Sequence, residues 1–157
     1  MTTILMLGCV KTKVALRSDQ ALPAQDLYAS PLWRGRRRYA EARGLPWMIL
    51  SAKHGLILPT QEIALYDTKI SEVLPLREGL TKWHLITSKV LRSLSPAQPD
   101  PASPIICEIH AGAAYALRFR EAASLARCAV KILLPVAGLS LGMQLRYYSA
   151  AGDAHND

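Results

Sequence analysis

The sequence has few cysteines, and they lack the spacing of a metal site or a disulfide framework. Cys9, Cys107 and Cys128 are its three cysteines, and no two of them form a CxxC pair. An odd number of widely separated cysteines favours a reduced protein without structural disulfides. The histidines show no ligand spacing relative to these cysteines. We therefore expect no metal and no other cofactor.

Long apolar runs and nucleotide-binding fingerprints are also missing. No run approaches the roughly 20 apolar residues that cross a bilayer, and Met1–Ile4 has no basic segment typical of a signal peptide. These absences predict a cytoplasmic protein with no membrane partner. No GxGxxG, Walker A or GxSxG motif occurs, and the glycines of Gly138–Gly142 form no dinucleotide fingerprint.

Acidic residues are outnumbered by basic ones. The 157 residues include 12 Asp and Glu against 19 Lys and Arg, which gives a formal charge of +7 and a pI near 9.6. This excess predicts an anionic partner, either nucleic acid or a nucleotide or nucleoside. Half of the residues are hydrophobic, as in globular proteins. We expect a single domain over residues 1–150 and a disordered tail over residues 151–157.

Apolar runs of strand length alternate with segments of helical spacing. Ser30–Pro31 is a typical helix start, with serine as N-cap and proline in the first turn. The alternation predicts an α/β fold, a single three-layer α/β/α domain with a mostly parallel sheet of four or more strands. The expected strands cover 3–7, 47–50, 104–109 and 128–134, the expected helices cover 31–44, 76–94, 113–127 and 141–150, and 10–30 and 67–75 are expected to be irregular.

Each expected strand ends in a polar or glycine-containing turn. The first three turns are Gly8–Lys13, Ser51–Gly55 and Glu108–Gly112, and the fourth strand is followed by Pro135–Gly138. Because the carboxyl ends of parallel strands meet at one edge of a sheet, these turns are expected to form one ligand site. Glycines let backbone amides approach a ligand, and helix N-termini favour anions.

Two histidines and two carboxylates are the candidate catalytic groups of this edge. His54 and His110 are expected to shuttle protons or to contact a base. Asp67 or Glu108 is expected to activate water or to stabilise an oxocarbenium-like centre in glycosidic cleavage. The alternatives are histidines without a catalytic role and a Glu108 that only pairs with a lysine.

The other polar groups of the turns are candidate binding residues. Lysines are expected to hold phosphate, and tyrosines to stack on or orient a base. Cys9 is interpreted either as a nucleophile or as a small buried hydrophobe. The expected substrate-binding set is Cys9, Lys11, Lys13, Tyr28, Ser51, Lys53, Gly55, Tyr66, Gly112, Tyr115 and Gly138.

The first expected helix is rich in arginine. Its basic side chains, next to Trp33 and Tyr39, are suited to a nucleic-acid backbone. The alternative is a solvated helix face. The candidate nucleic-acid contacts are Arg34, Arg36, Arg37 and Arg38.

These landmarks occur in a fixed order from Gly8 to about Tyr148. They are Gly8-Cys9-x-Lys11-x-Lys13, Asp26-Leu27-Tyr28-x-Ser30, Leu50–Leu56, Tyr66-Asp67, His110-Ala111-Gly112-x-x-Tyr115 and Pro135-x-x-Gly138-x-x-x-Gly142-x-Gln144. The series resembles a family of small bacterial and phage domains of unknown function.

More distant resemblances cover shorter parts of the chain. The second turn, with Tyr66 after it, is similar to a block of YaaA-type peroxide-stress proteins, which bind DNA. The Cys9-x-x-x-Lys13 turn is similar to one in the core domain of archaeosine synthase, although Val10 stands where a small polar residue is expected. These resemblances imply a setting of nucleic acids or nucleobases.

Two functions follow as hypotheses. The first is an enzyme that processes a nucleobase or nucleoside, free or within DNA or RNA, by cleavage or base exchange at the glycosidic bond. It would be an N-glycosidase or a glycosyl or base transferase. The second is a DNA-binding protein without catalysis, from a stress response or a nucleic-acid modification system. Whether the protein is an enzyme is left open at this stage.

Overall fold

The computed structural model describes residues 2–154 except 97 and 99, and its centre is a five-stranded sheet. The strand order is β4-β3-β1-β6-β7, and all neighbours are parallel except β3 and β4. The bounds are β1 (Thr3–Gly8), β3 (Trp47–Ser51), β4 (Gly55–Ile57), β6 (Ile105–His110) and β7 (Val130–Leu133). The expected α/β fold with a mostly parallel sheet is confirmed.

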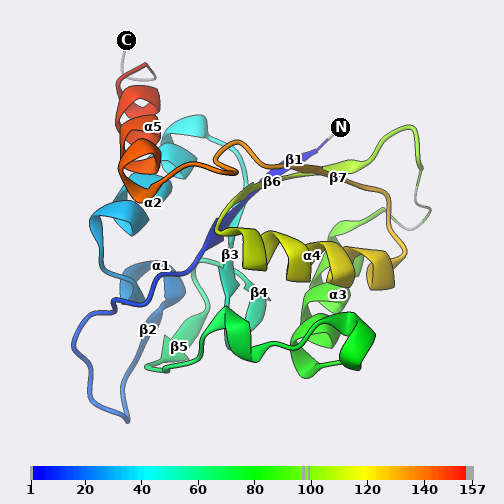
Figure 1. Cartoon of the computed structure of the whole chain (residues 1–157), viewed down its shortest axis with the longest axis horizontal. Coiled ribbons are helices and arrows are strands. Elements are labelled where there is room, and N and C mark those ends of the chain that lie inside the picture. The colour runs from blue at the N-terminus through cyan, green and yellow to red at the C-terminus, as the bar shows by residue number, and fades with distance from the viewer. Residues whose placement is uncertain (1, 97, 99, 155–157) are drawn as a thin grey trace.

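Helices cover both faces of the sheet (Figure 1). The helix α2 (Pro31–Arg43) packs beside α5 (Leu141–Ala154) on one face, and α3 (Lys82–Leu94) packs beside α4 (Ala113–Ala126) on the other. Each pair covers its own apolar cluster, centred on Trp33 and Tyr148 in the first case and on Trp83 and Phe119 in the second. The protein therefore has the three layers that alternating strands and helices require.

The central strand β1 is apolar because both of its faces are covered. Leu5, Met6 and Leu7 are fully buried. Leu5 and Leu7 contribute to the cluster under α2 and α5, whereas Met6 faces α3 and α4. Each such buried side chain contributes roughly 1.5–3 kcal/mol of hydrophobic stabilisation. A continuous apolar run is the pattern that a doubly covered parallel strand needs.

A small second sheet lies beyond the main one (Figure 1). It pairs β2 (Ala21–Pro23) with β5 (Glu62–Ala64), and the one-turn α1 (Ala24–Leu27) follows β2 directly. Residues 10–30 were expected to be irregular, and this expectation is wrong for 21–27. The strands have only three residues each, and their pairing across some 40 residues leaves no local signal.

The helix ends agree with the sequence in some places and differ in others. The Ser30 Oγ accepts a hydrogen bond from the Trp33 amide, and α2 ends at Gly44 with φ +62°, as the capping signals predict. The segment expected to be one helix from residue 76 contains instead a short 3-10 turn, η2 (Leu76–Glu78), and α3 begins after Thr81.

Two further segments differ from expectation. Another 3-10 turn, η1 (Ile70–Glu72), lies within residues 67–75, which were expected to be irregular. The last helix continues to Ala154, beyond its expected end at residue 150. Residues 155–157 of the expected tail lie outside the described residues.

None of the helices in the described part of the chain combines the length and the apolarity that a bilayer span requires.

Gly55 at the start of β4 provides a test of this packing. Its φ is +71°, and a Cβ there would lie 2.6 Å from the Thr87 Oγ1 of α3. We expect Gly55→Ala to lower the free energy of unfolding by about 2–4 kcal/mol in urea denaturation, because left-handed strain and overpacking add together.

Gly44 is the matched control for this substitution. Its φ is +62°, but a Cβ there would meet nothing within 4 Å. Gly44→Ala is therefore expected to cost only about 1–2 kcal/mol, the strain alone. Equal losses in the two variants would contradict the close contact between β4 and α3.

Candidate functional site

The turns that follow β1, β3 and β6 meet at the carboxyl edge of the sheet. Their strands are neighbours in the order β3-β1-β6. The Cys9 amide continues the ladder beyond β1 by donating to the Leu50 carbonyl, with N···O 3.0 Å. On the other side of β1, a Cβ at Gly8 would lie only 2.6 Å from the Ala111 Cβ. This edge is the part of an open α/β sheet where ligands bind.

Hydroxyl groups from three segments meet beside Cys9. The Tyr28 and Tyr66 hydroxyl oxygens are 2.6 Å apart, and the Ser51 Oγ donates to the Tyr66 oxygen at 2.9 Å. Tyr28 lies in the segment that follows the small sheet. An isolated bridge between Lys13 and Tyr28 joins this segment to the turn after β1. We call Tyr28, Ser51 and Tyr66 the hydroxyl cluster, together with Cys9 and the Tyr115 hydroxyl that contacts the Cys9 sulfur.

Cys9 has hydrogen-bond partners on two sides. Its Sγ lies 3.0 Å from the Tyr115 hydroxyl of α4 and accepts from the Ala52 amide at 3.4 Å. The residue is half-buried. The structure thus joins the ends of β1 and β3 to the first turn of α4 through this sulfur, as sequence analysis expected of a shared edge.

The phenols of the cluster remain protonated at neutral pH. Burial raises the pKa of Tyr28, Tyr66 and Tyr115 well above the ordinary 10.0, and the neighbouring Cys9 raises each pKa further. Protonated phenols both donate and accept hydrogen bonds, so they are suited to orienting a polar substrate.

His54 lies beside the cluster as a neutral imidazole. Its ring stands edge-on to Tyr66 with centroids 5.4 Å apart, and its amide donates to the Ser51 Oγ at 3.1 Å. Burial lowers its pKa below the ordinary 6.5, and the positive charges of Lys53 and Lys82 lower it further. A neutral histidine at pH 7 can accept a proton or read the edge of a base.

An open hollow of about 560 Å³ lies next to Tyr66. It is lined by Lys11, Lys13, Leu65, Tyr66 and Asp67. The Lys13 Nζ lies 4.4 Å from the centre of the Tyr66 ring, a cation–π contact. The exposed Asp67 carboxylate therefore shares the hollow with two ammonium groups, and we call it the Asp67 hollow.

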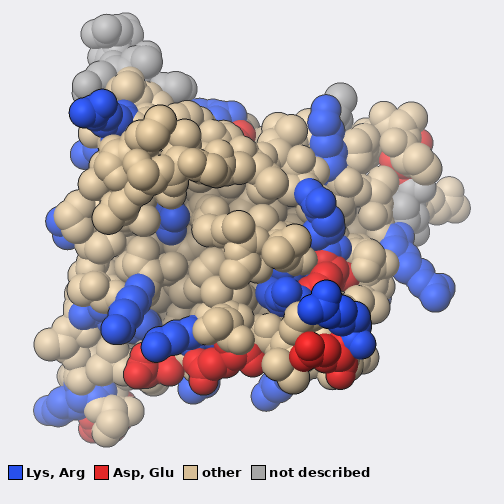
Figure 2. All heavy atoms as spheres, viewed as in Figure 1, with Lys and Arg blue, Asp and Glu red and all other residues tan. Residues whose placement is uncertain are grey.

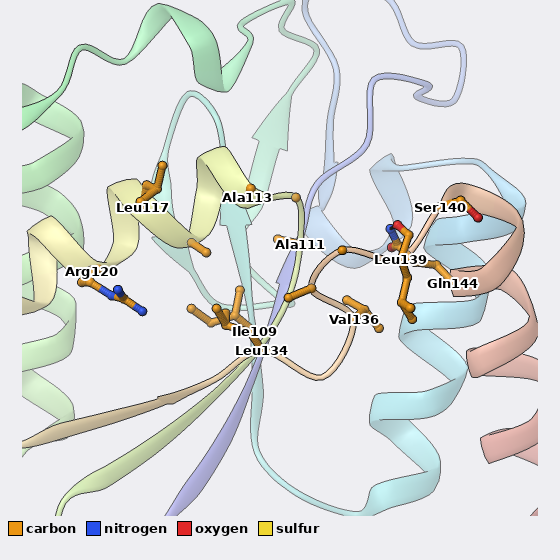
Figure 3. A pocket seen from close by; sticks show the side chains of 14 residues that line it. Ile109, Ala111, Ala113, Leu117, Arg120, Leu134, Val136, Leu139, Ser140 and Gln144 are labelled. Atoms are coloured by element: carbon orange, nitrogen blue, oxygen red, sulfur yellow. Dashed lines mark hydrogen bonds between the residues drawn. The ribbon is translucent and has the colours of Figure 1, made fainter.

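A larger cavity of about 650 Å³ opens between the first turns of α4 and α5 (Figure 3). Side chains from the ends of β6 and β7 and from both helices point into it, most of them apolar. In Figure 2 the surface between α4 and the loop leading into α5 is mostly tan, and acidic and basic residues gather along the lower margin. We call this space the α4–α5 cavity.

Two of the expected catalytic residues lie elsewhere. Glu108 and His110 face α2 and α5 inside the protein, and His110 is fully buried. The His110 ring nitrogens are 2.9 Å from the Tyr148 hydroxyl and 2.9 Å from the Glu108 Oε1, while Tyr39 and Arg43 also bind that carboxylate. The structure does not bring His110 to His54, and this network joins β6 to both helices.

The remaining expected residues have separate positions. Lys53 is exposed, and Gly55 packs under Thr87 of α3. Gly112 and Gly138 line the α4–α5 cavity.

The four arginines of α2 that were candidate nucleic-acid contacts do not share one surface. Arg34 and Arg38 are exposed, whereas Arg37 pairs with Asp26 and Glu41. Arg36 is buried, 4% exposed, and its Nη1 donates to the Gly8 carbonyl at 2.8 Å. The spacing Trp33, Arg36, Tyr39 indicates the buried face of the helix and is the signal that sequence analysis missed.

The apolar lining of the α4–α5 cavity was also missed. Leu117 lines it from α4, and Leu134, Val136 and Leu139 line it from the loop between β7 and α5. Their clustering is a tertiary feature, and the nearest signal in the sequence is the landmark from Pro135 to Gln144. In the described residues, no group of three or more His, Cys, Asp or Glu has a geometry that holds a metal ion.

Comparison with known proteins assigns the chain to a family. A model for a family of unknown function, DUF6884, matches residues 4–150. The chain belongs to this family. No curated protein and no solved structure matches the chain. The DUF6884 match covers all the elements of the carboxyl edge, from β1 through the first turns of α5.

The Glu108 network gives a pH-dependent prediction. The hydrogen bond from His110 and the charges of His110 and Arg43 lower the pKa of Glu108 below the ordinary 4.5, although burial opposes them. A lowered carboxyl pKa contributes stability that is present above pH 4.5 and is lost as the pH falls below it.

We therefore expect Glu108→Gln to lower the free energy of unfolding by about 2–3 kcal/mol at pH 7. The difference from the unchanged protein should shrink as the pH falls below 4.5, measured by urea denaturation. Glu41→Gln, an exposed carboxylate paired with Arg37, is the control and should cost less than about 0.5 kcal/mol. A loss that does not depend on pH would contradict an ionised Glu108.

Proposed function

We propose that the protein is an enzyme that cleaves or exchanges a base at the N-glycosidic bond of a nucleoside, free or within a nucleic acid. The observation that carries the proposal is the Asp67 hollow, which an exposed carboxylate lines together with two lysines and Tyr66 of the hydroxyl cluster. The hollow is at the carboxyl edge of a parallel sheet, where open α/β proteins bind their substrates.

The chemistry needs a carboxylate near the sugar and donors near the base. As the C1′–N bond breaks, its electron pair leaves with the base and positive charge develops on the sugar ring. Asp67 stabilises this charge and takes one proton from the attacking water, whose oxygen bonds to C1′. The departing base gains a proton, so water is added across the bond. In base exchange, a nitrogen of a second base replaces water.

Other residues of the edge have supporting roles in this proposal. Lys11 and Lys13 bind phosphate groups next to the sugar, and their charge matches the overall excess of +7. His54, neutral at pH 7, contacts the edge of the base. The protonated Tyr66, held by Ser51 and Tyr28, orients the sugar or the base. Glu108 has no part in the reaction, because it is buried in the network with Arg43 and His110.

The distant similarity to YaaA-type proteins motivates DNA binding without catalysis as the competing proposal. It was based on the arginines Arg34, Arg36, Arg37 and Arg38 of α2 and on the same lysines. Arg36 is buried and Arg37 is held by two carboxylates, so of the four candidate arginines Arg34 and Arg38 remain exposed for a nucleic acid. The geometry therefore favours the enzyme.

The test measures, by chromatography, the release of free base from a panel of nucleosides, nucleotides, DNA and RNA. We expect the unchanged protein to release base from one substrate class, with and without a second base as acceptor. Asp67→Asn should reduce the rate by about 100-fold or more, because a neutral amide neither stabilises the cation nor takes the proton.

Asp19→Asn is the control for Asp67→Asn. Asp19 is an exposed carboxylate paired with Arg17, outside the Asp67 hollow, and its loss should leave the rate unchanged. If no substrate loses a base, while DNA binding weakens stepwise in Arg34→Gln and Arg38→Gln, the enzyme proposal fails and the binding proposal replaces it.

A further inference from the structure

The most unusual charge in the protein is the Arg36 guanidinium. It is 4% exposed, and among the described residues it forms no ion pair with a carboxylate. Its contacts are neutral oxygens, namely the Gly8 carbonyl, the Gln144 amide and the Tyr148 hydroxyl. Its Nε has no acceptor within the described structure. A buried cation without a counter-charge is costly unless something else neutralises it.

The guanidinium lies directly behind the wall of the α4–α5 cavity. Its Nη2 donates to the Gln144 Oε1, with N···O 3.4 Å, and Gln144 lines the cavity. Its Nη1 binds Gly8, which packs against Ala111, another residue of the cavity wall. In Figure 3 Gln144 lies in front of α2, the helix that carries Arg36. Gln144 therefore connects the charge to the cavity wall.

The opposite side of the cavity is the N-terminus of α4. This helix has 14 residues, and its N-cap Gly112 provides no side chain to bind the free amides of the first turn. Gly112 and Ala113 line the cavity. Unpaired amides at a helix N-terminus attract an anion, and here they act together with the buried guanidinium.

The rest of the cavity is suited to an apolar ring. Leu117, Leu134, Val136 and Leu139 line it, and its volume of about 650 Å³ is in the range of small-molecule sites. Arg120 extends from α4 at the mouth of the cavity (Figure 3). A ligand with a flat apolar body and one anionic end would use both parts.

We propose that the α4–α5 cavity binds a phosphate monoester of a molecule that carries a flat apolar ring. The phosphate lies between Arg36 and the amides that begin α4, and the ring packs against the leucines. Without ligand, the Gln144 Oε1 occupies the place of a phosphate oxygen. Its long contact with Arg36 indicates a weak bond that a charged oxygen displaces, because charge-assisted hydrogen bonds are stronger. This inference does not depend on base release at the Asp67 hollow.

Gln144→Glu is the variant that separates a ligand site from a structural arginine. The new carboxylate has the same shape as the amide and supplies the missing counter-charge, so the variant should fold and melt at a higher temperature. The variant should also bind phenyl phosphate roughly ten- to a hundred-fold more weakly by calorimetry, because the new carboxylate binds the Arg36 guanidinium in place of the phosphate. Met143→Glu, an exposed neighbour outside the lining, adds the same charge and should change the affinity only a few-fold.

Ala113→Asp is an independent second variant. Ala113 is exposed at the first position of α4, where a carboxylate favours the helix and repels a phosphate. It should weaken phenyl phosphate binding by a similar factor without loss of melting temperature.

Different ligands also distinguish the contribution of the anion to the affinity from that of the ring. The unchanged protein should bind phenyl phosphate and adenosine monophosphate more tightly than phenol, adenosine or inorganic phosphate. Asp67→Asn should leave these affinities unchanged even when base release is lost. The proposal is overturned if phenyl phosphate does not bind, if phenol binds equally well, or if Gln144→Glu and Ala113→Asp bind phenyl phosphate like the unchanged protein.

Discussion

The close approach of β1 and β6 at their carboxyl ends is the constraint on which the rest of the edge depends. Gly8 has no side chain, and Ala111 occupies the space that one would need. Beside this contact the Gly8 carbonyl accepts from Arg36, and the Cys9 Sγ lies 3.0 Å from the Tyr115 hydroxyl of α4. A larger residue at either position would force the turns after β1 and β6 apart.

Two buried charge systems lie on the α2–α5 side of the sheet, and they differ in how the charge is compensated. Glu108 has Arg43, His110 and Tyr39 as partners, so its charge is balanced and its pKa is low. Arg36 has neutral oxygens as its partners. A compensated network stabilises the fold, whereas an uncompensated guanidinium next to a cavity is suited to a ligand. The arginine-rich sequence of α2 thus combines a structural role with the binding role proposed for Arg36.

Much of the architecture could be predicted from local patterns. The continuous apolar runs identified β1, β3, β6 and β7 to within about two residues, and Ser30, Pro31 and Gly44 marked the two ends of α2. The strands β2, β4 and β5 were missed because three residues carry no usable period, and their pairing depends on distant partners. The histidines show the same limit. His54 is in a turn and reaches the edge, but His110 is within a strand, where alternation directs it into the helical layer.

The sequence by itself determined the α/β class, the order of strands and helices, and the edge where the polar turns meet, because these depend on apolar periodicity and on glycine and proline signals. Only the tertiary structure decided which polar residues share a site. It joined Tyr28, Ser51 and Tyr66 through a small sheet, buried Arg36 and His110, and formed an apolar cavity from two separate stretches, 109–120 and 134–144. The physical reason is that side-chain direction and burial depend on packing between elements far apart in the chain, which no local pattern encodes.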